Sequence, residues 1–286
     1  MLNKVYKGDS IDYLKKIENE SIDVIFSDPP YGTGKEREVQ RRTNKHRHKY
    51  KIKDTNKQKN TDDSYGNEFK KLNMWDYIDD NEFWEWFIPY IDECNRVLRK
   101  GGYIIMWFDR DKINFLSAYL KKNGFKLRNY IADVITNPVP KAGCISWMNS
   151  FGMIGIWIKS GGKYTYNGKE LGQHSEHFIW QTEADGLITR PILSGKERYK
   201  DATNKAFHPT QKPEHICKDI IEYFSNENEV ILDPFMGIGT IPVVAKQLNR
   251  NFIGIEKVQK YFDLAKKRLD ETKKINNKLK SKFFKV

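Results

Sequence analysis

The stretch S-D-P-P-Y-G-T-G at residues 27–34 follows directly on the apolar run V-I-F at residues 24–26. It places the Asp28 carboxylate, a backbone stiffened by Pro29 and Pro30, and the Tyr31 ring at the predicted end of a buried strand. These groups offer hydrogen-bond acceptors and a stacking surface within four residues. The stretch is therefore a candidate catalytic site, although a turn aspartate and a core tyrosine are the simpler interpretation of each residue alone.

A second candidate site lies at residues 230–240, V-I-L-D-P-F-M-G-I-G-T, which run from a predicted strand through a glycine-rich turn into a predicted helix. Gly237 and Gly239 allow a tight turn and close approach of a ligand to the backbone. Glu256 ends the next predicted strand, where a carboxylate can accept hydrogen bonds from both ribose hydroxyls of a nucleoside. The third glycine of a dinucleotide fingerprint and the G-K-S/T of a phosphate loop are missing, so a nucleoside without phosphates fits better.

The elements around these sites alternate between strand and helix patterns, which predicts an α/β fold with a mostly parallel sheet. In such sheets, ligands bind beyond the carboxyl ends of the strands. Four acidic residues are expected at such ends: Asp9, Asp28, Asp233 and Glu256. The predicted strands are residues 5–6, 21–26, 103–108, 125–136, 153–159, 230–232 and 252–255, and the predicted helices are residues 11–17, 83–99, 111–122, 216–224, 240–248 and 258–269.

The formal net charge of +12 is concentrated in two segments. Residues 35–60 contain 11 Lys and Arg against 3 Asp and Glu, and residues 266–286 contain 9 against 2. A mildly acidic body with two basic segments favours a polyanionic partner, with solvated lysine-rich segments as the alternative. Residues 32–75 are otherwise poor in apolar side chains, and a loop of this length is usually functional or disordered.

The three cysteines are far apart in the sequence, which argues against a disulfide framework and a zinc site and for a reducing compartment. His174 and His177 are three positions apart, and we interpret them as surface or packing histidines and expect no metal. No apolar run approaches the length of a membrane span, and the N-terminus has no signal-peptide pattern. The sequence therefore predicts a soluble intracellular protein with no membrane partner.

Three motifs together resemble the S-adenosylmethionine-dependent DNA amino-methyltransferases. They are D-P-P-Y at residues 28–31, H-P-T-Q-K-P at residues 208–213 and D-P-F-M-G-I-G-T at residues 233–240. The catalytic motif comes first and the cofactor motif last, which resembles the β-class permutation of that family. The resemblance covers most of residues 1–31, 83–160 and 205–270.

The resemblance implies a single methyltransferase domain over residues 1–286, with a circularly permuted, mostly parallel Rossmann-like sheet and a small inserted recognition lobe. It also implies S-adenosylmethionine as the cofactor and double-stranded DNA as the partner. It assigns catalysis to Asp28, Pro29, Pro30 and Tyr31. The implied cofactor-binding residues are Asp9, which would approach the adenine, Glu256 on the ribose, Phe235, Gly237 and Gly239 at the methionine end, Thr210 closing the pocket, and Asp28 and Asp233.

The chemistry implied by the resemblance explains the first stretch. An exocyclic amine on a nucleobase is a poor nucleophile, because its lone pair is delocalised into the ring. Asp28 and the Pro29 carbonyl can accept its two hydrogens and stabilise the developing positive charge, while Tyr31 stacks on the base. Because the amine lies inside duplex DNA, the base must be flipped out. Residues 32–75 are then the expected DNA-contacting loop and residues 161–204 the expected target-recognition region.

Several alternatives remain at this point. Cytosine-N4 members of the family more often carry serine at the position of Asp28, so adenine N6 is favoured over cytosine N4. An RNA or protein-glutamine substrate is a weaker alternative, because protein-glutamine enzymes of similar pattern usually carry asparagine at the position of Asp28. A nucleotide-binding oxidoreductase is disfavoured by the incomplete glycine pattern. A non-catalytic DNA-binding protein that kept the fold is disfavoured because Asp28, Tyr31 and Glu256 are all present. The resemblance also allows a homodimer, a partner restriction endonuclease and a cytoplasmic, nucleoid-associated location.

Overall fold

The computed structural model describes residues 1–32, 80–137, 150–168, 187–190, 193 and 197–273. The chain divides into two compact units, Met1–Pro29 with Asp92–Val286, and Pro30–Ile91. Most of the expected DNA-contacting loop and much of the expected recognition region, including His174 and His177, lie outside the described residues. The expectation of a single domain over residues 1–286 therefore stays a prediction.

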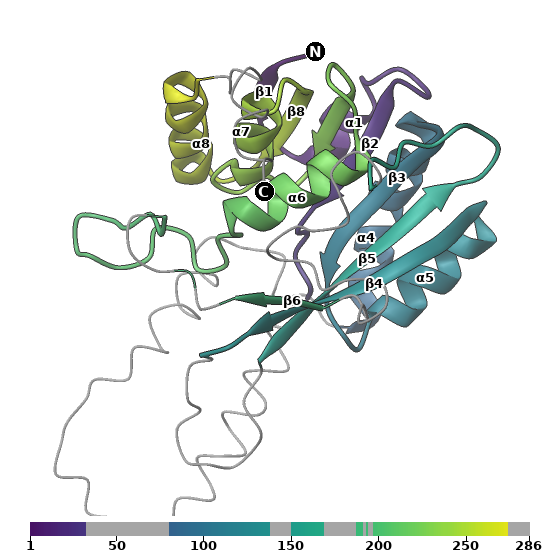
Figure 1. The fold of residues 1–286 in the computed structure, drawn as a ribbon, viewed down its shortest axis with the longest axis horizontal. Helices are drawn as coiled ribbons and strands as arrows, with labels where there is room; N and C mark the ends of the chain where they lie inside the picture. Colours follow the sequence, from purple (N-terminus) through teal and green to yellow (C-terminus); the bar gives the residue numbers. More distant parts are fainter. Residues whose placement is uncertain (33–79, 138–149, 169–186, 191–192, 194–196, 274–286) are drawn as a thin grey trace, which may run out of the picture. The chain divides into compact units, whose positions relative to one another are not determined.

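The first unit is built on an eight-stranded sheet with the strand order β1-β8-β7-β2-β3-β5-β4-β6 (Figure 1). Neighbouring strands pair in parallel except at β5, which runs antiparallel to both β3 and β4. This confirms the predicted α/β class with a mostly parallel sheet. The strands are β1 (Lys4–Lys7), β2 (Ile22–Ser27), β3 (Leu98–Phe108), β4 (Phe125–Ile135), β5 (Phe151–Lys159), β6 (Leu187–Arg190), β7 (Val230–Asp233) and β8 (Asn251–Glu256).

The centre of the sheet joins segments from the two ends of the sequence. Ile25 of β2 lies opposite Leu232 of β7, and Leu232 lies opposite Ile253 of β8. All three side chains are buried, as expected for parallel strands that are covered on both faces. This adjacency is what the circular permutation predicts, because it places Asp28, which follows β2, beside the glycine-rich turn that follows β7.

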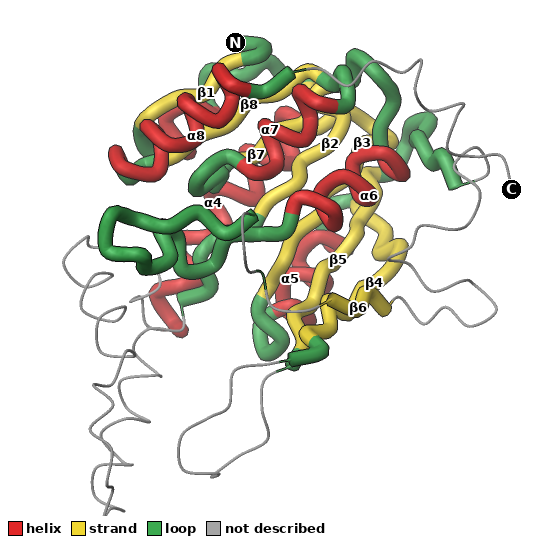
Figure 2. The backbone as a smooth tube through the Cα atoms, turned by 60° about the vertical axis from the view of Figure 1, so that its left-hand side comes forward, coloured by secondary structure: helices red, strands yellow, loops and turns green. Residues whose placement is uncertain are grey.

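Helices cover both faces of the sheet in the first unit. Figure 2 shows α6 and α7 on one side of the strands and α5 on the other. The apolar residues of α6 recur at helical spacing, and Ile216, Ile220 and Phe224 are buried. The helices are α1 (Ser10–Leu14), α4 (Asp80–Val97), α5 (Ile113–Lys122), α6 (Glu214–Phe224), α7 (Thr240–Gln247) and α8 (Gln259–Glu271).

The start of β3 differs from the sequence prediction. We expected the helix to run to residue 99 and a strand to begin at residue 103, but α4 ends at Val97 and β3 begins at Leu98. Ile22 lies opposite Leu98 and Val24 opposite Tyr103, so β3 bulges between them. A Cβ at Gly101 would lie 2.0 Å from the Lys163 carbonyl oxygen. The glycine pair thus allows close backbone approach and does not end a helix.

A second difference is β6, a strand within residues 161–204, a region with no predicted strand. It extends the sheet by pairing in parallel with the end of β4. No helix in the described part of the chain is long and apolar enough to span a membrane.

The described residues of the second unit are 30–32 and the first part of α4, which spans the boundary between the units. Aromatic rings dominate this part of α4, and Phe83 and Phe87 stack with their centres 5.3 Å apart. Gly32 has a φ of +68°, and a Cβ there would lie 2.7 Å from the Phe83 ring. The turn after Tyr31 therefore requires glycine, both for its backbone conformation and for space.

Candidate active site at the carboxyl edge of the sheet

Four acidic residues lie at one edge of the sheet, which we call the carboxyl edge. Asp233 and Glu256 end β7 and β8, Asp28 follows β2, and Asp9 lies two residues after β1. Because β1, β8, β7 and β2 are parallel neighbours, their carboxyl ends meet at this edge. The structure thus brings together four residues that are up to 247 positions apart in the sequence.

The turn between β7 and α7 is shaped by its two glycines. Gly237 and Gly239 have φ values of +53° and +78°, a left-handed conformation that side chains rarely adopt. A Cβ at Gly239 would lie 2.8 Å from the Ala265 Cβ. The Glu256 carboxylate accepts hydrogen bonds from the N–H groups of Gly237 at 3.0 Å and Val258 at 2.6 Å. The carboxylate at the end of β8 is therefore fixed against the glycine turn.

Asp233 and Glu256 are buried carboxyl groups with perturbed acidity. Burial raises the pKa of Asp233 to about 7, although the Ser27 hydroxyl and the Phe235 N–H donate hydrogen bonds to it. Burial likewise raises the pKa of Glu256 to about 7 against its backbone hydrogen bonds. Both groups therefore titrate near neutral pH.

Asp9 has a structural contact as well as its place at the edge. Its carboxylate caps α1 by accepting a hydrogen bond from the Ile11 N–H at 3.3 Å. The Lys257 ammonium lies 3.0 Å from the other carboxylate oxygen, and the Lys257 side chain is half exposed. Asp9 is thus held beside the residue that follows Glu256, which suits its predicted place near a nucleoside bound on β8.

Asp28 forms an ion pair that the sequence analysis did not predict. The Lys212 ammonium lies 2.5 Å from one oxygen of the Asp28 carboxylate, and each side chain is 17% exposed. The same ammonium lies 5.4 Å from the centre of the Trp107 ring, which stacks on Phe26 at 5.1 Å. Lys212 comes from the H-P-T-Q-K-P motif, and the family resemblance does not fix the chemistry of this lysine.

His208 from the same motif lies beside the glycine turn. Its ring packs edge-on against Tyr261 with 4.5 Å between the ring centres. Burial, followed by the positive charges of Lys212, Lys260 and Arg198, lowers the pKa of His208 to about 3. The imidazole is therefore neutral at neutral pH, with Nδ1 3.3 Å from the Thr210 N–H and Nε2 facing Gly237.

The remaining predicted residues are less closely tied to the edge. Thr210 is exposed and contacts His208 through its backbone, and Phe235 is half-buried in the glycine turn. Pro29 is buried and ends the first of the two segments that form the first unit. Pro30 and Tyr31 continue from it into the second unit, so their predicted roles stay predictions. Within the described residues, no group of three or more His, Cys, Asp or Glu could hold a metal ion.

The edge fits a cationic nucleoside without phosphates. Glu256 ends β8, where we expect it to meet ribose hydroxyls, the positive-φ glycines allow a ligand close to the backbone, and buried carboxyl groups favour positive charge nearby. The turn at residues 234–239 contains no lysine or arginine that would favour phosphates. S-adenosylmethionine, the cofactor expected from the sequence, has this chemistry.

The comparisons with known proteins agree with this reading. Residues 22–267 match the family described as DNA methylase, with N6 and N4 specificities. Over 276 residues, the chain is 35% identical to Type II methyltransferase M.HinfI of Haemophilus influenzae, covering 95% of this chain and 69% of that protein. It is 31% identical over 267 residues to Type II methyltransferase M2.LlaDCHI of Lactococcus lactis subsp. cremoris, covering 92% and 88%.

Solved structures support the fold. The M1.HpyAVI–SAM complex matches with a TM-score of 0.60 at 24% identity, covering 93% of this chain and 98% of that one. The PvuII DNA methyltransferase, which is cytosine-N4-specific, matches with a TM-score of 0.63 at 16% identity, covering 93% and 85%. At these identities, the similarity establishes the architecture.

Proposed function

Because the chain belongs to the S-adenosylmethionine-dependent DNA amino-methyltransferases, we propose that it methylates the N6 amine of adenine in a specific duplex DNA sequence. The observation that carries the choice of base is Asp28 at the end of β2, since cytosine-N4 members more often carry serine there. Asp28 lies at the same edge as the glycine turn and Glu256, which supports methyl transfer from a cofactor at that turn to an amine at Asp28.

The catalytic groups act on the amine of a base that has left the duplex. The Asp28 carboxylate accepts one amine hydrogen and the Pro29 carbonyl accepts the other, which favours the pyramidal nitrogen and its developing positive charge. Consecutive prolines restrict the backbone, so these acceptors need little reorganisation. Tyr31 stacks on the base and orients its amine. When bound, S-adenosylmethionine supplies the electrophilic methyl group.

The cofactor residues hold the nucleoside and its positive charge. Glu256 accepts hydrogen bonds from the ribose hydroxyls, and Asp9 lies near the adenine. Gly237, Gly239 and Phe235 line the methionine end. Thr210 closes the pocket from the segment before α6. Asp233 shapes the glycine turn by accepting a hydrogen bond from the Phe235 N–H.

We assign DNA binding to two segments of the chain, most of the first and much of the second lying outside the described residues. Residues 32–75 follow the phosphates with their basic side chains and close over the flipped base, and residues 161–204 read the target sequence. The relatives named as type II methyltransferases favour a role in restriction-modification, with a partner endonuclease and a homodimer as further elements. A cytoplasmic, nucleoid-associated location follows from a DNA substrate.

The proposal is tested by identifying the labelled nucleoside. The protein is incubated with radiolabelled S-adenosylmethionine and mixed-sequence duplex DNA, and the DNA is digested to nucleosides. We expect the label in N6-methyladenine. Asp28→Ala should lower the rate by about 10²–10³-fold, the usual cost of removing a group that stabilises transition-state charge. Cofactor binding by calorimetry and thermal unfolding of the variant are the controls for folding.

Two other outcomes would change the conclusion. Label in N4-methylcytosine would keep the mechanism and reject adenine as the base. No label in any nucleoside, with cofactor binding intact, would favour the alternative of a DNA-binding protein that retains the fold without catalysis.

A further inference from the structure

The ion pair between Lys212 and Asp28 joins two sequence motifs that are 184 positions apart. The pair is half-buried, and the aliphatic stem of Lys212 brings its ammonium to the Trp107 ring as well as to the carboxylate. The Trp107 ring also stacks on Phe26, which belongs to β2, the strand that ends just before Asp28. The ammonium, the ring and the carboxylate therefore form one packed group at the end of β2 and β3.

A comparison with a second ion pair shows what is particular about Lys212. Arg268 lies 2.7 Å from the Glu214 carboxylate, is almost fully buried, and also donates hydrogen bonds to the Ile238 carbonyl and the Thr240 hydroxyl. That guanidinium ties α8 to the start of α6 and α7, which is a scaffolding role. Within the described part of the chain, the partners of the Lys212 ammonium are instead the Asp28 carboxylate and the Trp107 ring.

We propose that Lys212 is a positioning residue, whose ammonium binds one oxygen of the Asp28 carboxylate and holds it in the orientation that receives the target amine. The inference rests on the proposed function, in which Asp28 is the catalytic acceptor. An aspartate at the end of a strand can rotate about two side-chain bonds, and water competes for its oxygens. A fixed cation restricts this rotation, and misplacement of a reacting group by about 1 Å can cost about 10²-fold in rate.

The chemistry of lysine suits this task. An ammonium is a compact point charge that needs one oxygen, whereas the planar guanidinium of arginine tends to engage both oxygens of a carboxylate. A lysine can therefore anchor one oxygen of the carboxylate, and an arginine would keep the attraction with a less suitable geometry. The Trp107 ring also stabilises the Lys212 ammonium, because a cation is attracted to the face of an indole ring.

The test is a single-turnover assay with enzyme in excess over DNA and saturating radiolabelled S-adenosylmethionine. Lys212→Gln removes the charge and keeps most of the side-chain volume, so we expect the single-turnover rate to fall about 10- to 100-fold. Lys212→Arg keeps the positive charge and should recover part of that loss. The matched control is Lys218→Gln, which removes an exposed lysine on α6 and should leave the rate unchanged.

Binding and stability separate positioning from other roles. The dissociation constants of S-adenosylmethionine, by calorimetry, and of DNA, by fluorescence anisotropy, should change less than about twofold in Lys212→Gln, since the lost contact is to Asp28. A normal saturated rate with weaker binding of either ligand would overturn the proposal, as would a Lys212→Arg rate no higher than that of Lys212→Gln. If Lys212→Gln does not fold, Lys212→Arg is compared with the wild-type protein instead, and a single-turnover rate equal to that of the wild-type protein would then overturn the proposal.

Failure of this inference is distinguishable from failure of the proposed function. If the wild-type protein methylates DNA and Lys212→Gln does so at the same saturated rate, Lys212 has no positioning role. If the wild-type protein itself leaves every nucleoside unlabelled, the proposed function fails first.

Discussion

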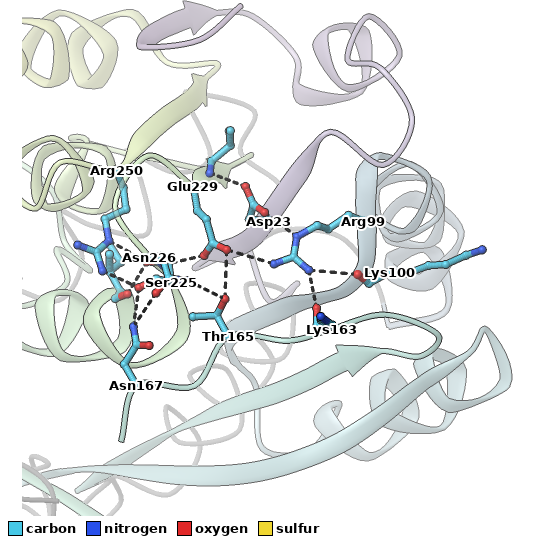
Figure 3. Close-up of polar contacts among 12 residues, drawn as sticks. Asp23, Arg99, Lys100, Lys163, Thr165, Asn167, Ser225, Asn226, Glu229 and Arg250 are labelled. Atoms are coloured by element: carbon cyan, nitrogen blue, oxygen red, sulfur yellow. Dashed lines mark hydrogen bonds and ion pairs between the residues drawn. The ribbon is translucent and has the colours of Figure 1, made fainter. Parts of the chain in front are cut away.

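The two edges of the central parallel strands differ in the partners of their buried and half-buried carboxylates, Asp23 and Glu229 at one edge and Asp233 and Glu256 at the other. At the amino edge, the Arg99 guanidinium lies 2.6 Å from the Asp23 carboxylate and 3.3 Å from the Glu229 carboxylate (Figure 3). Arg99 also donates hydrogen bonds to the backbone carbonyls of Lys100 and Lys163. At the carboxyl edge, the hydrogen-bond donors to Asp233 and Glu256 are backbone N–H groups and one hydroxyl.

The amino edge extends this pairing into a wider network. Glu229 accepts further hydrogen bonds from the Thr165 hydroxyl and the Asn226 N–H. Asn167 donates a hydrogen bond to the Ser225 carbonyl. The Arg250 guanidinium donates hydrogen bonds to both the hydroxyl and the carbonyl oxygen of Ser225. The network therefore fastens the segment after β5 to the turn between α6 and β7, as Figure 3 shows.

We interpret the difference as one between carboxylates that stabilise the fold and carboxyl groups that can serve the proposed cofactor site. Charges that only stabilise the fold are neutralised by partners within the chain, which limits the cost of burying them. The raised pKa values of Asp233 and Glu256 mean that the folded state binds their protons more tightly than the unfolded state. Both groups therefore lower stability as the pH rises toward 7, a cost that a bound cation or donor ligand can offset.

Among the substitutions that compare the two edges, the largest effect is expected at Glu256, on the affinity for the cofactor. Glu256→Gln removes a charged hydrogen-bond acceptor, worth about 1.5–3 kcal/mol, so the dissociation constant of S-adenosylmethionine should rise about 10- to 100-fold. Calorimetry on the wild-type protein and the variant measures this. An unchanged dissociation constant would mean that the carboxylate does not hold the cofactor.

The pH dependence of the same binding sharpens this prediction. With a pKa of about 7, Glu256 is largely protonated below that pH, and a ligand that needs the carboxylate must displace the proton. Affinity should therefore increase as the pH rises through about 7 in the wild-type protein, and this increase should be smaller in Glu256→Gln.

A smaller effect, on stability and not on binding, is expected at the amino edge. Arg99→Met removes the shared cation and leaves two half-buried carboxylates, which should lower the free energy of unfolding by about 1–2 kcal/mol after allowing for solvent screening. Urea unfolding measures the loss, with the exposed neighbour Lys100→Gln as the control. A weakened cofactor affinity in folded Arg99→Met would contradict the division between the two edges.

The smallest effect is expected at the Asp9–Lys257 pair, the most exposed ion pair of the carboxyl edge. Lys257→Gln should change the free energy of unfolding by less than about 0.5 kcal/mol, because exposed ion pairs contribute little. A loss as large as that of Arg99→Met would show that the carboxyl edge also depends on charge pairing for its stability.

Much of this organisation is predictable from local patterns. Buried strands, amphipathic helices and left-handed glycines leave signals within a few residues, so most elements and the carboxylates at the strand ends could be placed in advance. The bulge at Gly101 and Gly102 lies between the predicted helix at residues 83–99 and the predicted strand at residues 103–108. A glycine pair after a basic turn has the same local pattern at a helix end and at a strand bulge. The close approach of the pair to the Asp23 and Lys163 backbone is a long-range contact, which a local pattern does not reveal.

Sequence alone therefore determined which residues could do chemistry and that each would follow a strand, because strand periodicity and turn residues are local properties of the chain. Tertiary structure decided which of them meet. The strand order placed β7 beside β2, brought Lys212 to Asp28 and Ser27 to Asp233, and gathered Arg99, Asp23 and Glu229 at the opposite edge. Burial at those meeting points then set the acidity of Asp233 and Glu256, since the pKa of a carboxyl group depends on the solvent and charges around it.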